Sequence, residues 1–477
     1  MAQIYVLPDD VLLDIFDFYV ALHSPGLGKL EVEAVEAWQS LVHVCRRWRN
    51  VVFRSPRRLN LRLRFTPKTP ARDTLDIWPA FPLVICGYMN PSETENVIAA
   101  LEQSNRVCQV DLTLLNLAGW QMEKFLAPMQ VPFPGLTDLR LFSFDKRTPV
   151  IPDSFLGGSA PRLQFLQLRG IPFPGLPKLR SSATHLVNLH LENIPISGYI
   201  SPEAIVALIS VLFSLNELTL EFQSPQSRPD RETRLPPPSN RSVIPALHDF
   251  RFKGAIEYLE DLVTCVDAPQ LKGMYIKFFN QIDFDTPRLA HFINRTPTLR
   301  KSDAHVRFYD YFAHVELHAA PKLVALEIAI SCGEPDWQLS SIEQVCNSFW
   351  LPLSTVEHLY IERHYLELFW RDDAIENTLW LQLLLPFTAV KNLYLHEDFA
   401  PGIAAALQEL DGGRITEVLP SLQSIFVQWL KPSGPFQENI GQFVAARRLF
   451  DHPITIFAWD ESSNFSRKYS HYSSHAR

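Results

Sequence analysis

The sequence predicts an α/β protein in which a small N-terminal group of helices precedes an irregular solenoid with a curved, mostly parallel sheet and convex-side helices. Three observations predict this fold: helical spacing of apolar residues over 7–53, a short apolar pattern that recurs from about residue 105, and helix-like stretches between its copies. The chain has 477 residues, so several domains or an elongated repeat array are expected.

Two segments near the N-terminus have the spacing of amphipathic helices. Pro8 suits the first turn of a helix, because its missing N–H is not needed there, and Asp9 and Asp10 suit the positive end. Short helices with this much apolar surface cannot cover all of it, so we expect part of it to contact another protein. The apolar residues at helical spacing are Val11, Leu12, Ile15, Phe16 and Tyr19 in the first segment, and Val35, Trp38, Leu41, Cys45, Trp48 and Val52 in the second.

These residues resemble the F-box, the three-helix module that binds the Skp-type adaptor of cullin-RING ubiquitin ligases. The resemblance covers about a tenth of the chain and rests on the Leu-Pro-x-x-x-Leu-x-x-Ile-Phe opening and the Val-Cys-Arg-Arg-Trp close. The segment 23–36 is longer than the usual link between the first two helices of the family. The alternative is that the helices only cap the rest of the fold. The resemblance implies that the adaptor-facing or closely supporting residues are Leu7, Pro8, Leu12, Ile15, Phe16, Val44, Cys45 and Trp48.

An apolar triplet, spaced apolar-x-x-apolar-x-apolar, recurs through the rest of the chain. Its twelve copies begin 23 to 34 residues apart, and seven carry proline two residues before the first apolar position. Such a proline ends the preceding segment and leads into an extended strand. Helical spacing lies between copies, at 201–213, 255–266 and 342–350. The middle residues are Val110, Leu139, Leu166, Leu189, Leu218, Phe250, Met274, Ser302, Leu326, Leu359, Leu393 and Ile425, with the copy at Ser302 degenerate, and we expect each middle leucine to be almost fully buried.

This order of strand, turn and helix resembles the leucine-rich repeats that follow an F-box in many substrate adaptors, the fungal ones in particular. The Asn or Cys that usually follows the third apolar residue is mostly absent, so we expect an irregular arc. The predicted organisation is an F-box at 1–55, linking strands and a cap at 56–104, an irregular leucine-rich-repeat domain at 105–460 with a flexible proline-rich loop at 223–245, and a disordered tail at 461–477.

Composition narrows the function classes. The hydrophobic content of 47% is that of a folded protein, and the net charge of −8 argues against general nucleic-acid affinity. Six cysteines without a Cys-x-x-Cys pair indicate reduced thiols, which predicts a cytoplasmic or nuclear location. No apolar run is long enough for a membrane span and no signal segment is recognisable. The arginine-rich stretch 46–64 is interpreted as a solvated face or a contact for an acidic adaptor surface, with nucleic-acid binding as the less favoured alternative.

The final repeats present aromatic residues on the expected inner, concave face of the sheet. Alternation in a strand turns the residue between the last two apolar positions of each triplet toward that face. There we expect a protein substrate, because aromatic rings beside polar groups are typical of binding hot spots. The alternative is that the C-terminal segment folds over the rings. The tentative substrate-binding residues are Tyr360, Tyr394, Phe426, His358, His396 and Glu362.

No motif for nucleotide binding, metal ligation or nucleophilic catalysis is recognisable, so we expect neither cofactor nor metal. The sequence therefore favours a non-catalytic substrate-recognition subunit of a Skp–cullin–F-box ubiquitin ligase, with the adaptor, the cullin complex and an unknown protein substrate as partners. A repeat-protein scaffold without ubiquitination is the alternative, and an enzyme on an unrecognised α/β fold is a third interpretation.

Overall fold

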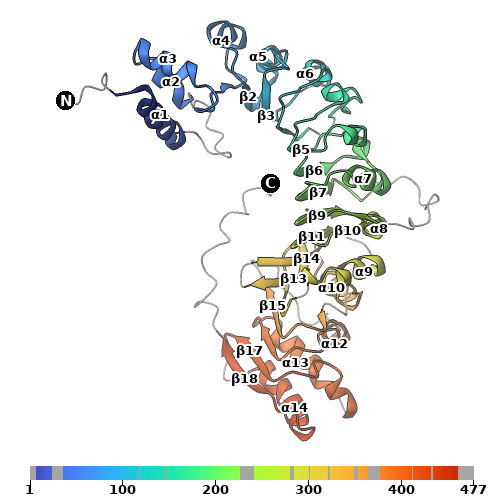
Figure 1. Ribbon diagram of the computed structural model, residues 1–477. Helices are drawn as coiled ribbons and strands as arrows, with labels where there is room; N and C mark the ends of the chain where they lie inside the picture. Colours follow the sequence, from blue (N-terminus) through green and yellow to red (C-terminus); the bar gives the residue numbers. More distant parts are fainter. Residues whose placement is uncertain are drawn as a thin grey trace. The chain divides into compact units, whose positions relative to one another are not determined.

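The computed structural model divides the chain into two compact units, Met1–Glu232 and Thr233–Arg477, each with helices along one side of its strands (Figure 1). The division falls inside segment 223–245, for which we predicted a loop and not a domain boundary. Residues 226–240 and the tail 461–477 lie outside the described part of the chain. The described residues are 7–23, 36–117, 119–145, 148–225, 241–279, 284–299, 301–320, 323–332, 334–348, 353–363, 376–410, 412–430 and 433–459.

The first unit begins with three helices and continues as strands that alternate with helical segments. Its α-helices are α1 (Asp9–His23), α2 (Ala37–Val42), α3 (Arg46–Arg54), α4 (Ala71–Ile77), α5 (Thr94–Leu101), α6 (Gly119–Leu126) and α7 (Pro202–Ile209). Its strands are β1 (Leu63–Phe65), β2 (Leu83–Met89), β3 (Val107–Leu114), β4 (Asp138–Ser143), β5 (Phe165–Arg169), β6 (Asn188–Ile194) and β7 (Glu217–Phe222). Local signals start these elements: Ser201 caps α7 by accepting a hydrogen bond from the Ala204 N–H (3.2 Å), and Pro202 takes the first turn.

The strands of the first unit pair in chain order, and every pairing is parallel. The middle residues of successive triplets lie directly opposite one another, as Leu139 does to Leu166 and Leu189 to Leu218. All of them are buried against the helical side. The predicted parallel sheet and the predicted burial of the middle residues are therefore confirmed for this unit.

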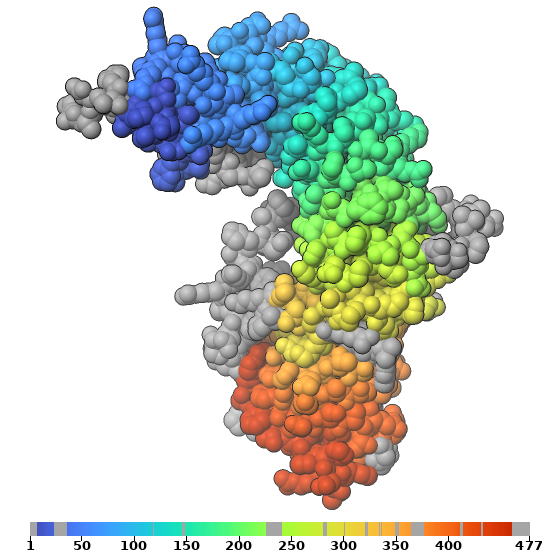
Figure 2. Space-filling view, viewed as in Figure 1, coloured from blue at the N-terminus to red at the C-terminus, as the bar shows by residue number. Residues whose placement is uncertain are grey.

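The N-terminal helices join the first unit through an aromatic cluster. Trp38 of α2 is buried, its ring centroid lies 5.2 Å from that of Trp78 and 5.5 Å from that of Phe81, and its indole N–H donates to the Arg62 carbonyl (3.0 Å). Helices and strands form one continuous block of side chains at this end of the unit (Figure 2). No helix among the described residues is long and apolar enough to cross a membrane.

The second unit has the same alternation with one interruption. Its α-helices are α8 (Ile256–Thr264), α9 (Pro287–Arg295), α10 (Pro335–Ser348), α12 (Asn377–Leu384), α13 (Ala400–Gln408) and α14 (Pro435–Leu449). Its strands are β8 (Ser242–Val243), β9 (Asp249–Gly254), β10 (Val266–Asp267), β11 (Gly273–Phe278), β12 (Asp303–Phe308), β13 (Phe312–Ala320), β14 (Leu323–Ser331), β15 (His358–Arg363), β16 (Asn392–Leu395), β17 (Ser424–Gln428) and β18 (Thr455–Trp459).

The interruption corrects the prediction that successive triplets form neighbouring strands. The order in the sheet is β9-β11-β14-β13-β12-β15-β16-β17-β18, and β13 is antiparallel to both of its neighbours. Only residues 309–311 separate β12 from β13, whereas a parallel crossover needs about a dozen residues. The chain therefore turns back on itself, so that β14 pairs with β11 and β12 pairs with β15.

Leu323, the first apolar position of its triplet, differs in exposure from the other two positions. It stands at the start of β14 and is 60% exposed, whereas Leu326 and Ile328 of the same triplet are buried.

This difference yields a test of the repeat register. Leu393→Ala should lower the free energy of unfolding by about 2–5 kcal/mol, because Leu393 is fully buried and its truncation leaves a cavity. Leu323→Ala makes the same chemical change at an exposed position of the same unit and should cost less than about 1 kcal/mol. Urea unfolding of both variants measures the difference, and equal losses would contradict the assigned register.

Candidate protein-binding surfaces

The two ends of the N-terminal motif meet in space. The Arg47 guanidinium of α3 donates to the carboxylate of Asp9 (2.7 Å) and to the carbonyl of Leu7, which ties the start of α1 to α3. The Trp48 ring packs on the Phe16 ring with centroids 4.7 Å apart. The Leu-Pro opening and the Cys-Arg-Arg-Trp close therefore form one surface region.

The structure separates the predicted adaptor-binding residues into two groups. Leu12 and Phe16 are buried inside the chain, so they support the surface and do not reach a partner. The remaining residues are accessible: Pro8, Ile15 and Val44 are exposed, and Leu7, Cys45 and Trp48 are partly exposed.

Helix α1 also carries an exposed apolar stripe that our sequence interpretation did not separate from its buried one. Val11, Ile15, Phe18 and Leu22 recur at helical spacing and are all exposed, Ile15 by 48% and Phe18 by 68%. We call these four residues the α1 stripe. The spacing of Phe18 and Leu22 after Ile15 was available in the sequence, but only packing shows which stripe is covered.

In the second unit, the inner face of the sheet carries a row of stacked rings. Strand register places His305, Tyr360, Tyr394, Phe426 and Phe457 directly opposite one another on β12, β15, β16, β17 and β18. Successive ring centroids lie 4.3, 4.2, 4.5 and 5.1 Å apart. Such spacings follow from the distance of about 4.8 Å between strands. We call these five residues the ring ladder.

The ladder contains the three rings that the sequence suggested and extends them at both ends. His305 and Phe457 were not predicted as ladder members, because neither stands at a recognised apolar triplet of the final repeats. Trp459, the last described residue, lies edge-on to Tyr394 with ring centroids 5.5 Å apart. The chain's own C-terminal strand thus covers part of the ladder, and Tyr360, Tyr394 and Phe426 remain partly exposed.

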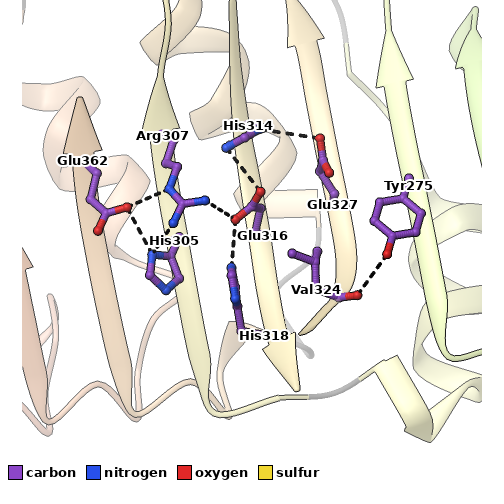
Figure 3. A network of polar contacts seen from close by, with 9 residues as sticks. All are labelled: Tyr275, His305, Arg307, His314, Glu316, His318, Val324, Glu327 and Glu362. Carbon is purple, nitrogen blue, oxygen red and sulfur yellow. Dashed lines mark hydrogen bonds and ion pairs between the residues drawn. The ribbon is translucent and has the colours of Figure 1, made fainter. Parts of the chain in front are cut away.

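Beside the ladder lies a buried polar cluster on β12, β13 and β15 (Figure 3). Arg307 donates from Nε to Glu362 (2.7 Å) and from Nη1 to Glu316 (2.5 Å). The His318 Nε2 lies 2.8 Å from the same Glu316 oxygen, and the His305 Nδ1 lies 3.2 Å from Glu362. The charges are therefore paired in a face of the sheet that a regular repeat leaves to solvent.

This pairing governs the protonation of the cluster. Burial alone would raise the pKa of Glu316, but the His318 hydrogen bond and the charges of His314 and Arg307 outweigh it and lower that pKa to about 2. Burial opposes ionisation of Glu362 too, and the His305 hydrogen bond and the Arg307 charge lower its pKa to about 2. Burial lowers the pKa of His305 more than Glu362 raises it, so its ring is held neutral.

The polar residues that the sequence analysis placed beside the rings are Glu362, His358 and His396, and they differ in their hydrogen-bond partners. Glu362 is committed to Arg307 and His305, so it does not offer its carboxylate to a ligand. His358 is partly exposed and its Nδ1 lies 3.2 Å from the Asn392 amide nitrogen. His396 belongs to the turn after β16, where its Nδ1 accepts from the Asp398 N–H (3.2 Å), and burial lowers its pKa.

Three members of the polar surface on β13, namely His314, Glu316 and His318, were missed from the sequence. The strand shows strict alternation of apolar and polar residues from Ala313 to His318, a half-buried strand signal. The triplet pattern does not contain that signal, so a search for triplets alone passes over it.

Comparison with known proteins adds little to this geometry. No family model and no curated protein matches the chain. Among solved structures it is similar to the leucine-rich repeat-containing protein LegL7 from Legionella pneumophila, with a TM-score of 0.26 and 13% identity, over 80% of this chain and 97% of that chain. At this TM-score the likeness carries no argument. The in-register parallel strands with helices along one side are themselves consistent with a leucine-rich-repeat-like array.

The shifted pKa values predict a pH dependence of stability. The pKa of His305 is lower in the folded chain than in the unfolded one, so its contribution to stability is complete above about pH 6.5 and is lost as the pH falls toward the folded value. His305→Gln keeps a hydrogen-bonding side chain that does not titrate. The free energy of unfolding should therefore differ more between wild type and variant at about pH 7 than at about pH 5. Urea titrations at both values measure this, and an unchanged difference would refute the assigned protonation state.

Proposed function

We propose that this chain is a non-catalytic substrate-recognition subunit of a Skp–cullin–F-box ubiquitin ligase. In this role the N-terminal helices bind the adaptor and the second unit's inner face binds a protein target. The rate of ubiquitin transfer would rise because the target's lysines are held near the ubiquitin-carrying enzyme, and not because this chain performs chemistry.

The observation that carries the adaptor part of the proposal is the accessible apolar surface at the motif. The α1 stripe and Val44 expose large apolar side chains, although Leu12, Phe16 and Trp38 give the same helices a buried core. A patch of this kind on a folded module is typical of a protein-interaction site. The Arg47 contacts to Asp9 and Leu7 hold the Leu-Pro opening at this surface.

The ring ladder supports the target-binding part of the proposal. Its partly exposed rings lose little side-chain entropy on binding and offer flat apolar area, as interface hot spots do. His358 and Asn392 lie beside it as polar groups that orient a ligand. The polar cluster beside the ladder pairs its own charges and so links β12, β13 and β15 next to the rings.

Ile15→Asp should abolish co-purification of the Skp-type adaptor, because it places a charge in the centre of the α1 stripe while Ile15 contributes no buried core. The double substitution Leu7→Ala with Pro8→Ala should also abolish adaptor co-purification, because it removes the Leu-Pro opening of the motif. Leu449→Asp on α14 is the matched control, since Leu449 is exposed but lies in the other unit. Retention of the adaptor by Ile15→Asp would contradict the F-box assignment. Adaptor without cullin in the wild-type eluate would favour the scaffold alternative.

Tyr360→Ala with Tyr394→Ala should release the target while the adaptor is retained, because the substitutions lie in the second unit and the α1 stripe in the first. Each hot-spot ring contributes about 2 kcal/mol or more to binding. Comparison by affinity purification and quantitative mass spectrometry identifies proteins that depend on these rings. Tyr275→Ala, at an inner-face tyrosine of β11 outside the ladder, is the control. A partner list that is unchanged by the double substitution would place the target site elsewhere.

A further inference from the structure

Two carboxylates face each other across the antiparallel strands β13 and β14. Glu316 lies directly opposite Glu327 in the register of the pair, and both side chains belong to the inner face of the sheet (Figure 3). Like charges in this position destabilise a sheet. The destabilisation grows where water is excluded, and Glu316 is buried. A positive charge between the two would remove it.

Arg307 does not fill that role. Its contact with Glu316 falls on Oε2, which His318 also approaches, and its Nε is committed to Glu362. The other oxygen of Glu316, Oε1, faces His314 instead. Arg307 therefore pairs with Glu316 and Glu362, whereas the contact of Glu327 within this cluster is with His314.

His314 points into the space between the two carboxylates. Its Nε2 lies 3.5 Å from Glu316 Oε1 and its Nδ1 lies 3.6 Å from Glu327 Oε1. The residue is 4% exposed, and neither ring nitrogen makes a hydrogen bond to any described residue. A buried imidazole without a hydrogen bond is costly, and a bound ion shared with the two carboxylates is one explanation for it.

The separations fit a shared metal ion better than direct hydrogen bonds. One ligand atom from each of His314, Glu316 and Glu327 lies within 4.8 Å of the others. Two ligands bound to one ion at about 2.1 Å are separated by about 3–4 Å, so small side-chain movements would complete the site. Glu327 is partly exposed and gives the ion a route from solvent.

We propose that His314, Glu316 and Glu327 bind one divalent first-row transition-metal ion that holds β13 to β14. One imidazole with two carboxylates suits Zn²⁺ or Mn²⁺, whereas Ca²⁺ and Mg²⁺ prefer sites built from oxygen alone. The ion would neutralise the facing carboxylates and fix the strand that interrupts the parallel sheet. This inference is independent of the proposed ligase role.

The test uses the full chain after treatment with EDTA and dialysis, titrated by calorimetry with ZnCl₂, with MnCl₂ and, as the oxygen-preferring ion that should bind weakly, with MgCl₂. Wild type should bind one equivalent of Zn²⁺, and His314→Gln and Glu327→Gln should each weaken that binding at least about tenfold. If circular dichroism shows that His314→Gln does not fold, the Zn²⁺ affinity of Glu327→Gln decides the test, because Glu327 is the more exposed ligand. Zn²⁺ should also raise the urea midpoint of wild type but not of Glu327→Gln.

His190→Gln is the matched control. His190 of β6 also faces a glutamate, with Nε2 3.3 Å from a Glu217 carboxylate oxygen, but it belongs to no three-ligand group among the described residues. Its substitution should leave the tight Zn²⁺ binding unchanged. The proposal is overturned if wild type binds no Zn²⁺ or Mn²⁺ equivalent, if both ligand variants bind as wild type does, or if His190→Gln removes the binding.

Discussion

Strand register is the constraint on which the rest of this structure depends. Because parallel strands pair position by position, side chains at matching register positions line up in columns across the strands of each unit. The column through Leu139, Leu166 and Leu189 is apolar and faces the helices. The column through Tyr360, Tyr394 and Phe426 lies on the opposite face and becomes a stack of rings. The core and the ladder are therefore two results of one pairing rule.

The antiparallel strand β13 changes what this rule permits. Its reversal brings His305 opposite Glu316 and Arg307 opposite His314, so that charged and imidazole groups alternate across the inner face. Burial makes each of these charges costly, and mutual pairing offsets the cost only while the geometry is held. The cluster thus acts as a register device: a slip by one residue would place Ala304 or Val306 against its charges.

The sequence predicts the regular parts of the fold because a single pattern carries them. Leu189 and Leu393 are buried as middle residues of a triplet, and the intervening helices follow from apolar spacing. The pattern fails at β13, where the short turn 309–311 forces a reversal that triplet spacing does not encode. On α1, Phe16 and Phe18 have equal apolar character, and only the packing of Trp48 on Phe16 decides which of them is covered.

At the proposed target site the ring ladder and the polar cluster would contribute differently to recognition. The cluster's charged groups already pair with one another, whereas the rings keep accessible edges. Glu362 and Arg307 already bind each other, so a ligand gains nothing by approaching them unless it breaks a buried pair. The rings are satisfied on their stacked faces, which leaves their outer edges as the accessible part, with Trp459 over Tyr394. A target bound at the proposed site would therefore be selected by shape against a row of edges, and it would obtain direction from the few polar groups beside them. His358 and Asn392 supply such groups in neighbouring strands, which favours a ligand that runs across the strands instead of along them.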